Sequence, residues 1–314
     1  MNSNIFSDFE IKVSIICITY NHVEYIRRAI QSFIEQKTDF KFEIIIHDDC
    51  STDGTIDIIK EYANLYPDII HPIYEIENQY SQGRKVIQEC TIPSAKGKYF
   101  ALCEGDDYWI DNMKLQRQFD FMEAHPEYTL CVHNAIRVND QDEFIRDWIV
   151  SSVDSDVSFD EVILGGGGFL PTNSIFAPMR MINHIPSYLK EKDIDYLWQI
   201  YLSSSNKVYC FKDQMSAYRQ MSKQSWTYSM KKNKVQYAEH IRHINELLVR
   251  ADQETGFTNH ASFQCKIIQN NIKLLRMENR YIELLKKPYR NQISKWTCKK
   301  KIKLFFEFLN FRRL

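Results

Sequence analysis

The sequence predicts an α/β protein in which a mostly parallel sheet is flanked by helices and followed by an α-helical C-terminal region. Strand-like and helical patterns alternate through the first hundred residues, as they do in parallel sheets with crossover helices. The strand-like runs are continuously apolar, which is typical of strands covered on both faces. From about Lys231 onward the pattern becomes helical.

The first four elements alternate between strand and helix. Val13–Ile18 is a β-branched run that predicts a strand, and Val23–Gln36 has the apolar spacing of a helix. Phe42–Ile46 predicts a second strand, and Thr55–Leu65 predicts a second helix. Because helices separate these strands, we expect the strands to run parallel and to end at one edge of the sheet.

The next elements continue this order. Tyr99–Cys103 predicts another buried strand, and Met113–Ala124 predicts a helix that ends before His125-Pro126. Leu130–Val138 predicts a further strand. Asn139–Asp160 is polar and acidic, so we predict a loop there.

The following segment is rich in glycine. Four successive glycines make Gly165–Asn173 a flexible or closely packed loop that could border a site, before the apolar Ser174–Ala177. No Lys-Ser or Lys-Thr follows the glycines, so a Walker-type phosphate loop is not supported. Ile194–Leu202 then predicts a short helix, and Lys207–Phe211 predicts a strand.

Charge is divided unevenly along the 314 residues. Residues 1–230 carry a net charge of −13, whereas residues 231–314 carry +12. We therefore predict an α/β domain at 1–230 and a basic α-helical region at 231–314, with Tyr237–Arg250 and Phe263–Leu285 as its clearest helices.

The chain has no signal-peptide pattern and no apolar run near the roughly 18 residues of a spanning helix, which predicts a cytosolic protein.

The eight cysteines of the chain lie far apart without any Cys-x-x-Cys pair. This spacing favours buried free thiols over a zinc site or a disulfide framework.

Three polar clusters directly follow predicted strands. They are Thr19-Tyr20-Asn21, His47-Asp48-Asp49 and Glu104-Gly105-Asp106-Asp107. Each cluster alone has an ordinary structural explanation, because Asn and Asp commonly cap helices and form turns. Gathered at one sheet edge, however, the carboxylates would repel one another, and a bound Mg²⁺ or Mn²⁺ would offset that repulsion. Such a cation usually fills its open positions with substrate phosphates.

The three clusters belong to longer segments. These segments read Val13-Ser-Ile-Ile-Cys-Ile-Thr-Tyr-Asn-His, Ile44-Ile-Ile-His-Asp-Asp-Cys-Ser-Thr-Asp-Gly-Thr and Ala95-Lys-Gly-Lys-Tyr-Phe-Ala-Leu-Cys-Glu-Gly-Asp-Asp-Tyr-Trp. In order and spacing they resemble the GT-A glycosyltransferases of family 2, over about residues 10–225. The resemblance implies a nucleotide-binding domain that transfers a sugar from a nucleotide diphosphate donor, with inversion at the anomeric carbon.

The resemblance also implies which residues contact the nucleotide. These residues are Thr19, Tyr20, Asn21, Asp48, Asp49, Gly83, Arg84, Glu104 and Asp106. Thr19 and Tyr20 would line the base and ribose pocket, and either Asp48 or Asp49 would bond the base. Gly83 and Arg84 match the family's Asn-x-Gly segment after the third strand.

Glu104-Gly-Asp106 stands where the family has its Asp-x-Asp motif, which places Asp106 and Asp107 near the ribose and the metal ion. The chain departs from the family pattern at two points. Glu104 replaces the first Asp, which lengthens the arm and keeps the charge. The segment Tyr218-Arg219-Gln220-Met221 lacks the His that relatives often have shortly after Tyr-Arg.

The resemblance places the catalytic base at the start of a helix in the second half of the domain. Asp193 and Asp195 are the candidates, and we prefer Asp195 because Tyr-Leu-Trp follows it as in relatives. Such a base would accept a proton from the acceptor hydroxyl. The alternative for both residues is an ordinary acidic first turn of a helix.

The C-terminal segment Leu285–Leu314 contains ten Lys and Arg residues against one acidic residue, together with many aromatic and aliphatic side chains. This composition predicts a helix that binds an anionic membrane surface. The alternative is a helix that packs its apolar side on the catalytic domain. Nucleic-acid binding is the weakest interpretation, because the rest of the chain has no basic groove or matching motif.

We therefore expect a metal-dependent, inverting sugar transferase in cell-surface polysaccharide or lipopolysaccharide assembly. The expected donor is a UDP-sugar, and the expected acceptor is a saccharide or a lipid-linked saccharide. The expected location is the cytoplasm, with attachment to the inner face of the plasma membrane as a further possibility. Two alternatives are a nucleotidyltransferase that acts on sugar phosphates and a non-catalytic protein that binds sugar nucleotides.

Overall fold

The computed structural model describes residues 11–190, 194–220 and 232–312. The chain divides into two compact units, Met1–Gln224 and Ser225–Leu314. The boundary expected between residues 230 and 231 lies outside the described residues. In the described part of the chain, no helix is both long and apolar enough to cross a membrane.

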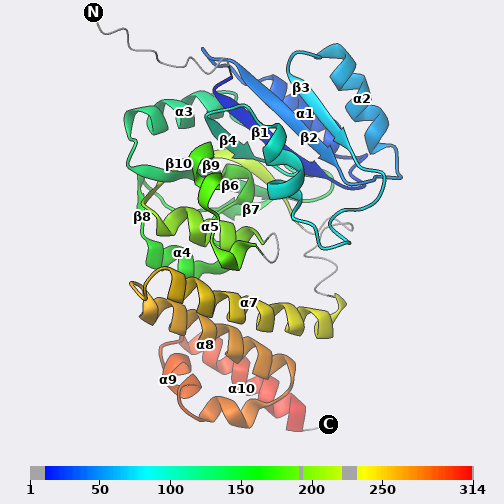
Figure 1. Ribbon diagram of the computed structural model, residues 1–314. Coiled ribbons are helices and arrows are strands. Elements are labelled where there is room, and N and C mark those ends of the chain that lie inside the picture. Colours follow the sequence, from blue (N-terminus) through cyan, green and yellow to red (C-terminus); the bar gives the residue numbers. More distant parts are fainter. Residues whose placement is uncertain (1–10, 191–193, 221–231, 313–314) are drawn as a thin grey trace, which may run out of the picture. The chain divides into compact units, whose positions relative to one another are not determined.

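The first unit is built on one ten-stranded sheet (Figure 1). Its strands are β1 (Val13–Thr19), β2 (Phe42–Asp48), β3 (Ile70–Tyr74), β4 (Tyr99–Leu102), β5 (Tyr108–Trp109), β6 (Tyr128–Val138), β7 (Phe144–Trp148), β8 (Ser155–Val157), β9 (Phe176–Pro178) and β10 (Lys207–Arg219). The spatial order is β3-β2-β1-β4-β9-β6-β10-β5, with β7 paired to β6 and β8 paired to β10. Strands β2, β1 and β4 run parallel, as predicted, and β3, which was not predicted as a segment of its own, pairs parallel with β2. Strand β9 is antiparallel to both β4 and β6.

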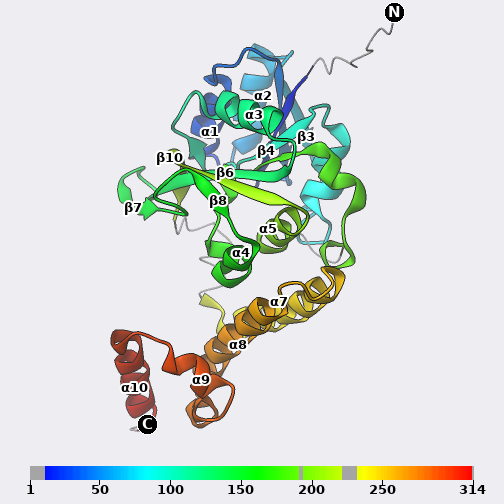
Figure 2. The same cartoon turned by 90° about the vertical axis from the view of Figure 1, so that its left-hand side faces the viewer.

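Helices cover both faces of this sheet (Figure 2). The helices are α1 (Ile26–Ile34), α2 (Thr55–Leu65), α3 (Lys114–Ala124), α4 (Phe159–Gly165) and α5 (Asp195–Ser204). Helices α1, α2 and α3 lie on one face, and α4 and α5 lie on the other. The chain also forms the short helical turns η1 (Val86–Thr91), η2 (Ile92–Ser94), η3 (Gly166–Gly168), η4 (Thr172–Ser174), η5 (Met179–His184) and η6 (Ser187–Leu189).

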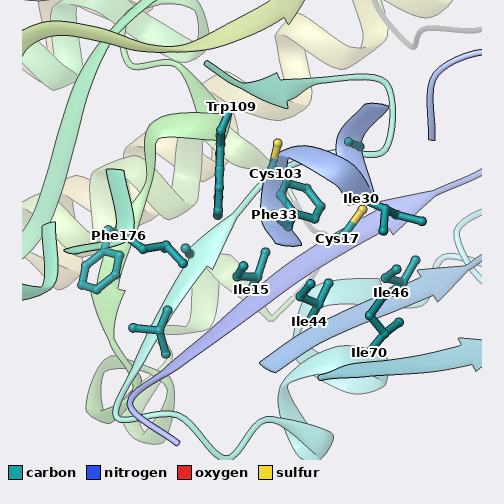
Figure 3. Packing of buried hydrophobic residues seen from close by; sticks show 14 of the residues in the cluster. Ile15, Cys17, Ile30, Phe33, Ile44, Ile46, Ile70, Cys103, Trp109 and Phe176 are labelled. Carbon is teal, nitrogen blue, oxygen red and sulfur yellow. The ribbon is translucent and has the colours of Figure 1, made fainter. Parts of the chain in front are cut away.

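The main hydrophobic core lies between the parallel strands and the helices α1 to α3. Ile15 of β1, Ile44 of β2 and Phe33 of α1 are fully buried there (Figure 3). The ring of Phe33 lies 4.8 Å from that of Trp109, in an edge-to-face arrangement. Successive side chains of a strand point to opposite faces, so Ile16 of β1 faces away from this core. The second face is the one on which the candidate site forms.

The prediction of a loop over Asn139–Asp160 is wrong in part, because this segment contains β7 and β8. Strand β7 pairs antiparallel with β6, and β8 pairs antiparallel with β10. Four of the five residues of β7 are exposed. A strand with so little burial lacks the apolar alternation by which a strand is recognised in a sequence.

Strand β10 continues well past the predicted Lys207–Phe211 and ends at Arg219. Its pairing with β6 shifts register between Phe211 and Gln214 and again between Gln214 and Ser216. Such irregularities interrupt the two-residue periodicity of a strand, which explains why the sequence pattern ended early.

The glycine-rich segment Gly165–Asn173 is closely packed, which is one of the two predicted alternatives. It contains the end of α4 and the turns η3 and η4. A Cβ atom on Gly165 would lie 2.4 Å from the side chain of Phe169, so only glycine fits at this position.

The second unit consists of α7 (Lys234–Glu254), α8 (His260–Met277), η7 (Tyr281–Leu285), α9 (Tyr289–Ser294) and α10 (Cys298–Arg312). The prediction of an α-helical C-terminal region is confirmed over residues 232–312. The predicted continuous helix at Phe263–Leu285 is wrong, because α8 ends at Met277. Asn279 has a φ of 58°, and the N–H of Arg280 donates to the carbonyl of Leu275, which is a helix-ending geometry.

Candidate active site

The carboxyl ends of three neighbouring parallel strands form one edge of the sheet. Strand β1 lies between β2 and β4, so the residues that follow these strands come together. The N–H of Asp49 donates to the carbonyl of Thr19 at 3.0 Å, and the N–H of Gly105 donates to that of Ile18 at 2.9 Å. The expectation that the three polar clusters share one edge is therefore met.

The residues after β1 hold the loop that follows β2. Asn21 has a φ of 55°, its N–H donates to Ser51 Oγ at 2.8 Å, and its Oδ1 accepts from the N–H of Thr52 at 2.8 Å. Thr19 is buried, while Tyr20 is 45% exposed. Of these three residues, Tyr20 presents the most side chain to a ligand, and Asn21 already has a structural role.

The two aspartates at the end of β2 have different surroundings: Asp48 is the last residue of the strand, and Asp49 follows it. Asp49 accepts from the N–H of Gln79 at 2.6 Å and from that of Tyr80 at 3.1 Å, so both of its carboxylate oxygens anchor the segment after β3. Asp48 accepts from the N–H of Ser51 at 2.8 Å through Oδ1. Its Oδ2 is buried and has no hydrogen-bond partner among the described residues. Asp48 therefore has an acceptor left for a ligand donor.

Gly83 and Arg84 lie in the segment after β3. Gly83 has a φ of 80°, a conformation that favours glycine. The guanidinium of Arg84 donates to Gln79 Oε1 and to Glu89 Oε2, each at 3.1 Å. Arg84 therefore contacts its own segment, and its expected role beside the nucleotide stays a proposal.

The loop after β4 packs tightly against β1. A Cβ atom on Gly105 would lie 2.7 Å from Oγ1 of Thr19 and 3.0 Å from Cδ1 of Ile26. Contacts this short are not tolerated between real side chains, so a glycine is required between Glu104 and Asp106. The spacing of the acidic motif thus follows from the close approach of two loops.

Asp106 and Asp107 differ although they are adjacent. Asp107 is 1% exposed, and its Oδ1 and Oδ2 accept from Arg219 N–H at 2.8 Å and from Asn173 Nδ2 at 2.9 Å. Burial and the neighbouring Asp106 carboxylate raise the pKa of Asp107 well above its usual range. Asp106 is half-buried, and its carbonyl accepts from Arg219 Nε at 2.9 Å. Asp107 is thus turned into the protein.

Asp195 is the first residue of α5 and is exposed. Thr172 Oγ1 donates to its Oδ2 at 3.4 Å. Asp195, Thr172 and Glu104 line one hollow on the face of the sheet opposite the main core. The apolar wall of this hollow is formed by Ile16, Ile18, Ile87, Leu102 and Cys103. Asp193, the other candidate base, lies outside the described residues.

The carboxylates at this hollow influence one another. Burial raises the pKa of Glu104 well above its usual range, and the charges of Asp195, Asp106 and Asp107 raise it further, in that order. Such crowding is costly for the folded protein unless a positive charge offsets it. Carboxylate oxygens are the ligands that Mg²⁺ and Mn²⁺ prefer, so the chemistry of these side chains suits a divalent cation.

The contacts of three residues at this site were not predicted from the sequence. Thr172 and Asn173 lie within the glycine-rich segment Gly165–Asn173, which was expected to border a site, but their individual roles were not predicted. Arg219 was noted in the sequence only because relatives often have a His shortly after Tyr-Arg. The hydrogen bonds of these residues join segments that are far apart in the chain, so local patterns could not show them.

The sequence profile of Glycosyl transferase family 2 matches residues 14–181, which contain all three polar clusters. The chain belongs to this family. The resemblance seen in the sequence is confirmed, and so is the predicted GT-A type of fold, a mostly parallel α/β sheet with C-terminal helices.

Two relatives of this chain come from bacteria. The uncharacterized protein Rv1520 of Mycobacterium tuberculosis (strain ATCC 25618 / H37Rv) is 34% identical over 215 residues, covering 68% of this chain and 60% of that protein. The UDP-Glc:alpha-D-GlcNAc-diphosphoundecaprenol beta-1,3-glucosyltransferase WfaP of Escherichia coli is 39% identical over 112 residues, covering 36% and 41%. The matched part of the chain thus spans 60% or less of the length of these two relatives.

Among solved structures, S. aureus TarS 1-349 in complex with UDP-GlcNAc has a similar fold, with a TM-score of 0.59 at 17% sequence identity. The match covers 96% of this chain and 79% of TarS 1-349. At 17% identity, this similarity shows a shared fold and no more.

Proposed function

We propose that this chain is an inverting glycosyltransferase that moves a sugar from a nucleotide diphosphate donor to a saccharide or lipid-linked acceptor. The observation that carries the proposal is the meeting of Asp195 with Glu104 in one hollow, beside Asp106. A carboxylate at the start of a helix thereby stands next to the acidic edge expected to bind a cation and a diphosphate. An inverting transfer needs a base for the acceptor hydroxyl close to the groups that stabilise the departing diphosphate.

The nucleoside is proposed to bind at the ends of β1 and β2. Tyr20 is exposed and can stack on a base, and Thr19 and Asn21 shape the loop beneath it. The unpartnered Oδ2 of Asp48 makes this residue, rather than Asp49, our choice to accept a hydrogen bond from the base. A UDP-sugar is the expected donor, since WfaP is named for UDP-Glc and TarS was solved with UDP-GlcNAc.

The divalent cation is proposed to be held by Asp106, with Glu104 beside it. A bound Mg²⁺ or Mn²⁺ neutralises charge on the departing diphosphate. Asp107 was expected to be a second ligand, but both of its oxygens accept hydrogen bonds within the protein. We therefore assign to Asp107 the positioning of the loop that carries Glu104 and Asp106.

Asp195 is proposed to act as the base. Its carboxylate accepts the proton of the acceptor hydroxyl while that oxygen bonds to the anomeric carbon, and the bond from this carbon to the diphosphate breaks on the opposite side. Thr172 holds Asp195 from one side. The apolar wall formed by Ile16, Ile18 and Leu102 limits access of bulk water to the reacting atoms.

The test is the variant Asp195→Asn, assayed for turnover of its sugar nucleotide and for equilibrium binding of the same donor. We expect turnover to fall about 10²- to 10⁴-fold while donor binding is retained. Asp57→Asn is a matched control, because Asp57 is also an exposed carboxylate in the first turn of a helix. Full turnover by Asp195→Asn would refute the assignment of the base.

The acceptor is proposed to be carried by a lipid, which gives helix α10 a role. The side chains of Ile302, Phe305 and Phe306 are more than half exposed, although each is large and apolar. Exposed lysines at 299, 300, 301 and 303 flank them, while Leu304 packs into the core of the second unit. An apolar stripe with a cationic border fits an anionic lipid surface. We thus propose peripheral attachment to the cytoplasmic face of a membrane, in cell-surface polysaccharide assembly.

A further inference from the structure

A second group of potential metal ligands lies at the ends of β2 and β3, apart from the acidic hollow. It consists of His47 in β2, Glu75 directly after β3, and Cys90 in η1. Each residue offers one ligand atom, and these atoms lie within 4.8 Å of one another. All eight cysteines are free thiols, as predicted, so Cys90 is available for coordination. The expectation that they are buried is wrong for four of them, because Cys50, Cys90 and Cys265 are half-buried and Cys298 is exposed.

The three residues are held by the fold rather than by chance contact. His47 is fully buried, and its Nε2 lies 3.2 Å from Oε1 of Glu75. The N–H of Glu75 donates to the carbonyl of Asp48 at 3.0 Å, which fixes Glu75 against β2. Cys90 is half-buried within the helical turn η1.

One ring nitrogen of His47 lacks a hydrogen bond among the described residues. His47 Nδ1 is buried and has no hydrogen-bond partner among the described residues. Since Nε2 already faces Glu75, the ring is buried without the pair of partners that a histidine usually has. An ion bound between His47 and Glu75 would use Nε2, the ring nitrogen that faces the carboxylate.

The mixture of ligand atoms decides which ion fits. One imidazole nitrogen, one carboxylate oxygen and one thiolate sulfur form the kind of set that zinc uses, whereas Mg²⁺ and Mn²⁺ prefer oxygen alone. Ligand atoms bound at 2.0 to 2.3 Å from a tetrahedral zinc lie roughly 3 to 4 Å apart, and the 3.2 Å between His47 Nε2 and Glu75 Oε1 falls in this range. Three protein ligands would leave one position for water.

We propose that His47, Glu75 and Cys90 form a zinc-type transition-metal site that ties the segment from Glu75 to Cys90 to the end of β2. This segment is otherwise held to the loop after β2 by Asp49, through the N–H groups of Gln79 and Tyr80. The guanidinium of Arg84 donates its hydrogen bonds to Gln79 and Glu89, and its positive charge also acts on Cys90 and Glu75. The ion would thus have a structural role, because it links this segment to β2. Its binding does not depend on sugar transfer.

Cobalt(II) substitution in the full chain tests this proposal. A thiolate ligand gives Co²⁺ an intense near-ultraviolet charge-transfer band, which carboxylate ligands such as those of Glu104 and Asp106 cannot produce. We expect the band to saturate at one Co²⁺ per chain, to disappear when Zn²⁺ is added, and to be absent in Cys90→Ser. Cys50→Ser is the matched control, because Cys50 is also half-buried near the end of β2 but lies outside the cluster.

Zinc affinity provides a second measurement that does not rely on the cysteine. In competition with a chromophoric chelator, His47→Gln and Glu75→Gln should each bind Zn²⁺ at least about tenfold more weakly than the unchanged chain. Circular dichroism establishes that each variant is folded. The proposal is overturned if the unchanged chain gives no charge-transfer band, if Cys90→Ser keeps the band, or if a folded Glu75→Gln binds Zn²⁺ with unchanged affinity.

Discussion

The N–H of Arg219 donates to Oδ1 of Asp107 across 2.8 Å, which joins the end of β10 to the loop after β4. The guanidinium of Arg219 adds a hydrogen bond to the carbonyl of Asp106 and an ion pair with Asp142. Arg219 is itself 2% exposed. The loop that carries Glu104 and Asp106 is therefore positioned by a residue from the other half of the domain.

This arrangement predicts that Asp107→Asn lowers the stability of the fold, whereas Asp106→Asn lowers turnover. Asp107→Asn places an amide N–H₂ against one of the two donors, Arg219 N–H or Asn173 Nδ2, so a buried hydrogen bond is lost. We expect the free energy of unfolding in urea to fall by about 1 to 3 kcal/mol. Asp106→Asn should leave stability nearly unchanged and abolish cation-dependent turnover. Equal stability of the two variants would contradict the inward orientation of Asp107.

Gly105→Ala tests the close approach of the two loops. The added Cβ would meet Oγ1 of Thr19 at 2.7 Å and Cδ1 of Ile26 at 3.0 Å, so the loop must shift. We expect a loss of about 1 to 3 kcal/mol of stability together with weakened donor binding. Gly168→Ala is a suitable control, because a Cβ there has no neighbour within 4 Å. If both variants behaved alike, the tight contact at Gly105 would be refuted.

Lys114 predicts a pH dependence of stability. It is fully buried, its Nζ donates to Gln118 Oε1 at 2.7 Å, and it lies 3.9 Å from the centre of the Trp109 ring. Burial lowers the pKa of Lys114 from 10.5 to about 7. Above pH 7 the folded state loses this proton while the unfolded chain keeps it. The free energy of unfolding should therefore rise with pH until the pH reaches about the pKa of Lys114 in the unfolded chain.

The measurement is the free energy of unfolding of the unchanged chain and of Lys114→Met at pH 7 and pH 8.5. Over this interval the unchanged chain should gain about 1 to 2 kcal/mol relative to the variant. Taking the difference removes titrations that both proteins share, such as that of Lys266, whose pKa burial lowers to about 8. Parallel pH profiles would show that Lys114 does not titrate in this range.

Helix α10 makes a prediction about lipid. The double variant Phe305→Ser with Phe306→Ser should sediment much less with vesicles containing an anionic lipid, and added salt should weaken binding of the unchanged chain. Both side chains are more than half exposed, so the fold should persist. Phe257→Ser, which is 54% exposed in the same unit, is the control. Unchanged sedimentation of the double variant would rule out this surface.

Much of the parallel half of the sheet could be predicted from the sequence, because its strands are apolar runs separated by helical patterns. Helix α2 was predicted with its observed bounds, Thr55–Leu65. Strands β7 and β8 were missed, since edge strands with exposed residues have no apolar signature. The bulged β10 was cut short at Phe211 for a related reason, the break in its alternation.

For the site, too, some features could be predicted from the sequence and others could not. The clusters after β1, β2 and β4 could be found because each follows a recognisable strand. Their individual roles could not, since the roles depend on long-range contacts. Asp107 looked equivalent to Asp106 in the sequence, yet Asn173 and Arg219 turn it inward. His47 and Cys90 carried no visible relation, because they lie 43 positions apart and meet only through the packing of η1 near β2.

Turnover of sugar nucleotides is the most direct test of the proposed activity. The chain is incubated with a panel of UDP-, GDP- and dTDP-sugars in the presence of Mn²⁺, Mg²⁺ or EDTA, and release of the nucleoside diphosphate is measured. We expect one donor, a UDP-sugar, to be turned over in a cation-dependent manner, and the release to be lost in Asp106→Asn. If no sugar nucleotide in the panel is bound or turned over, the proposal of a sugar transferase is contradicted.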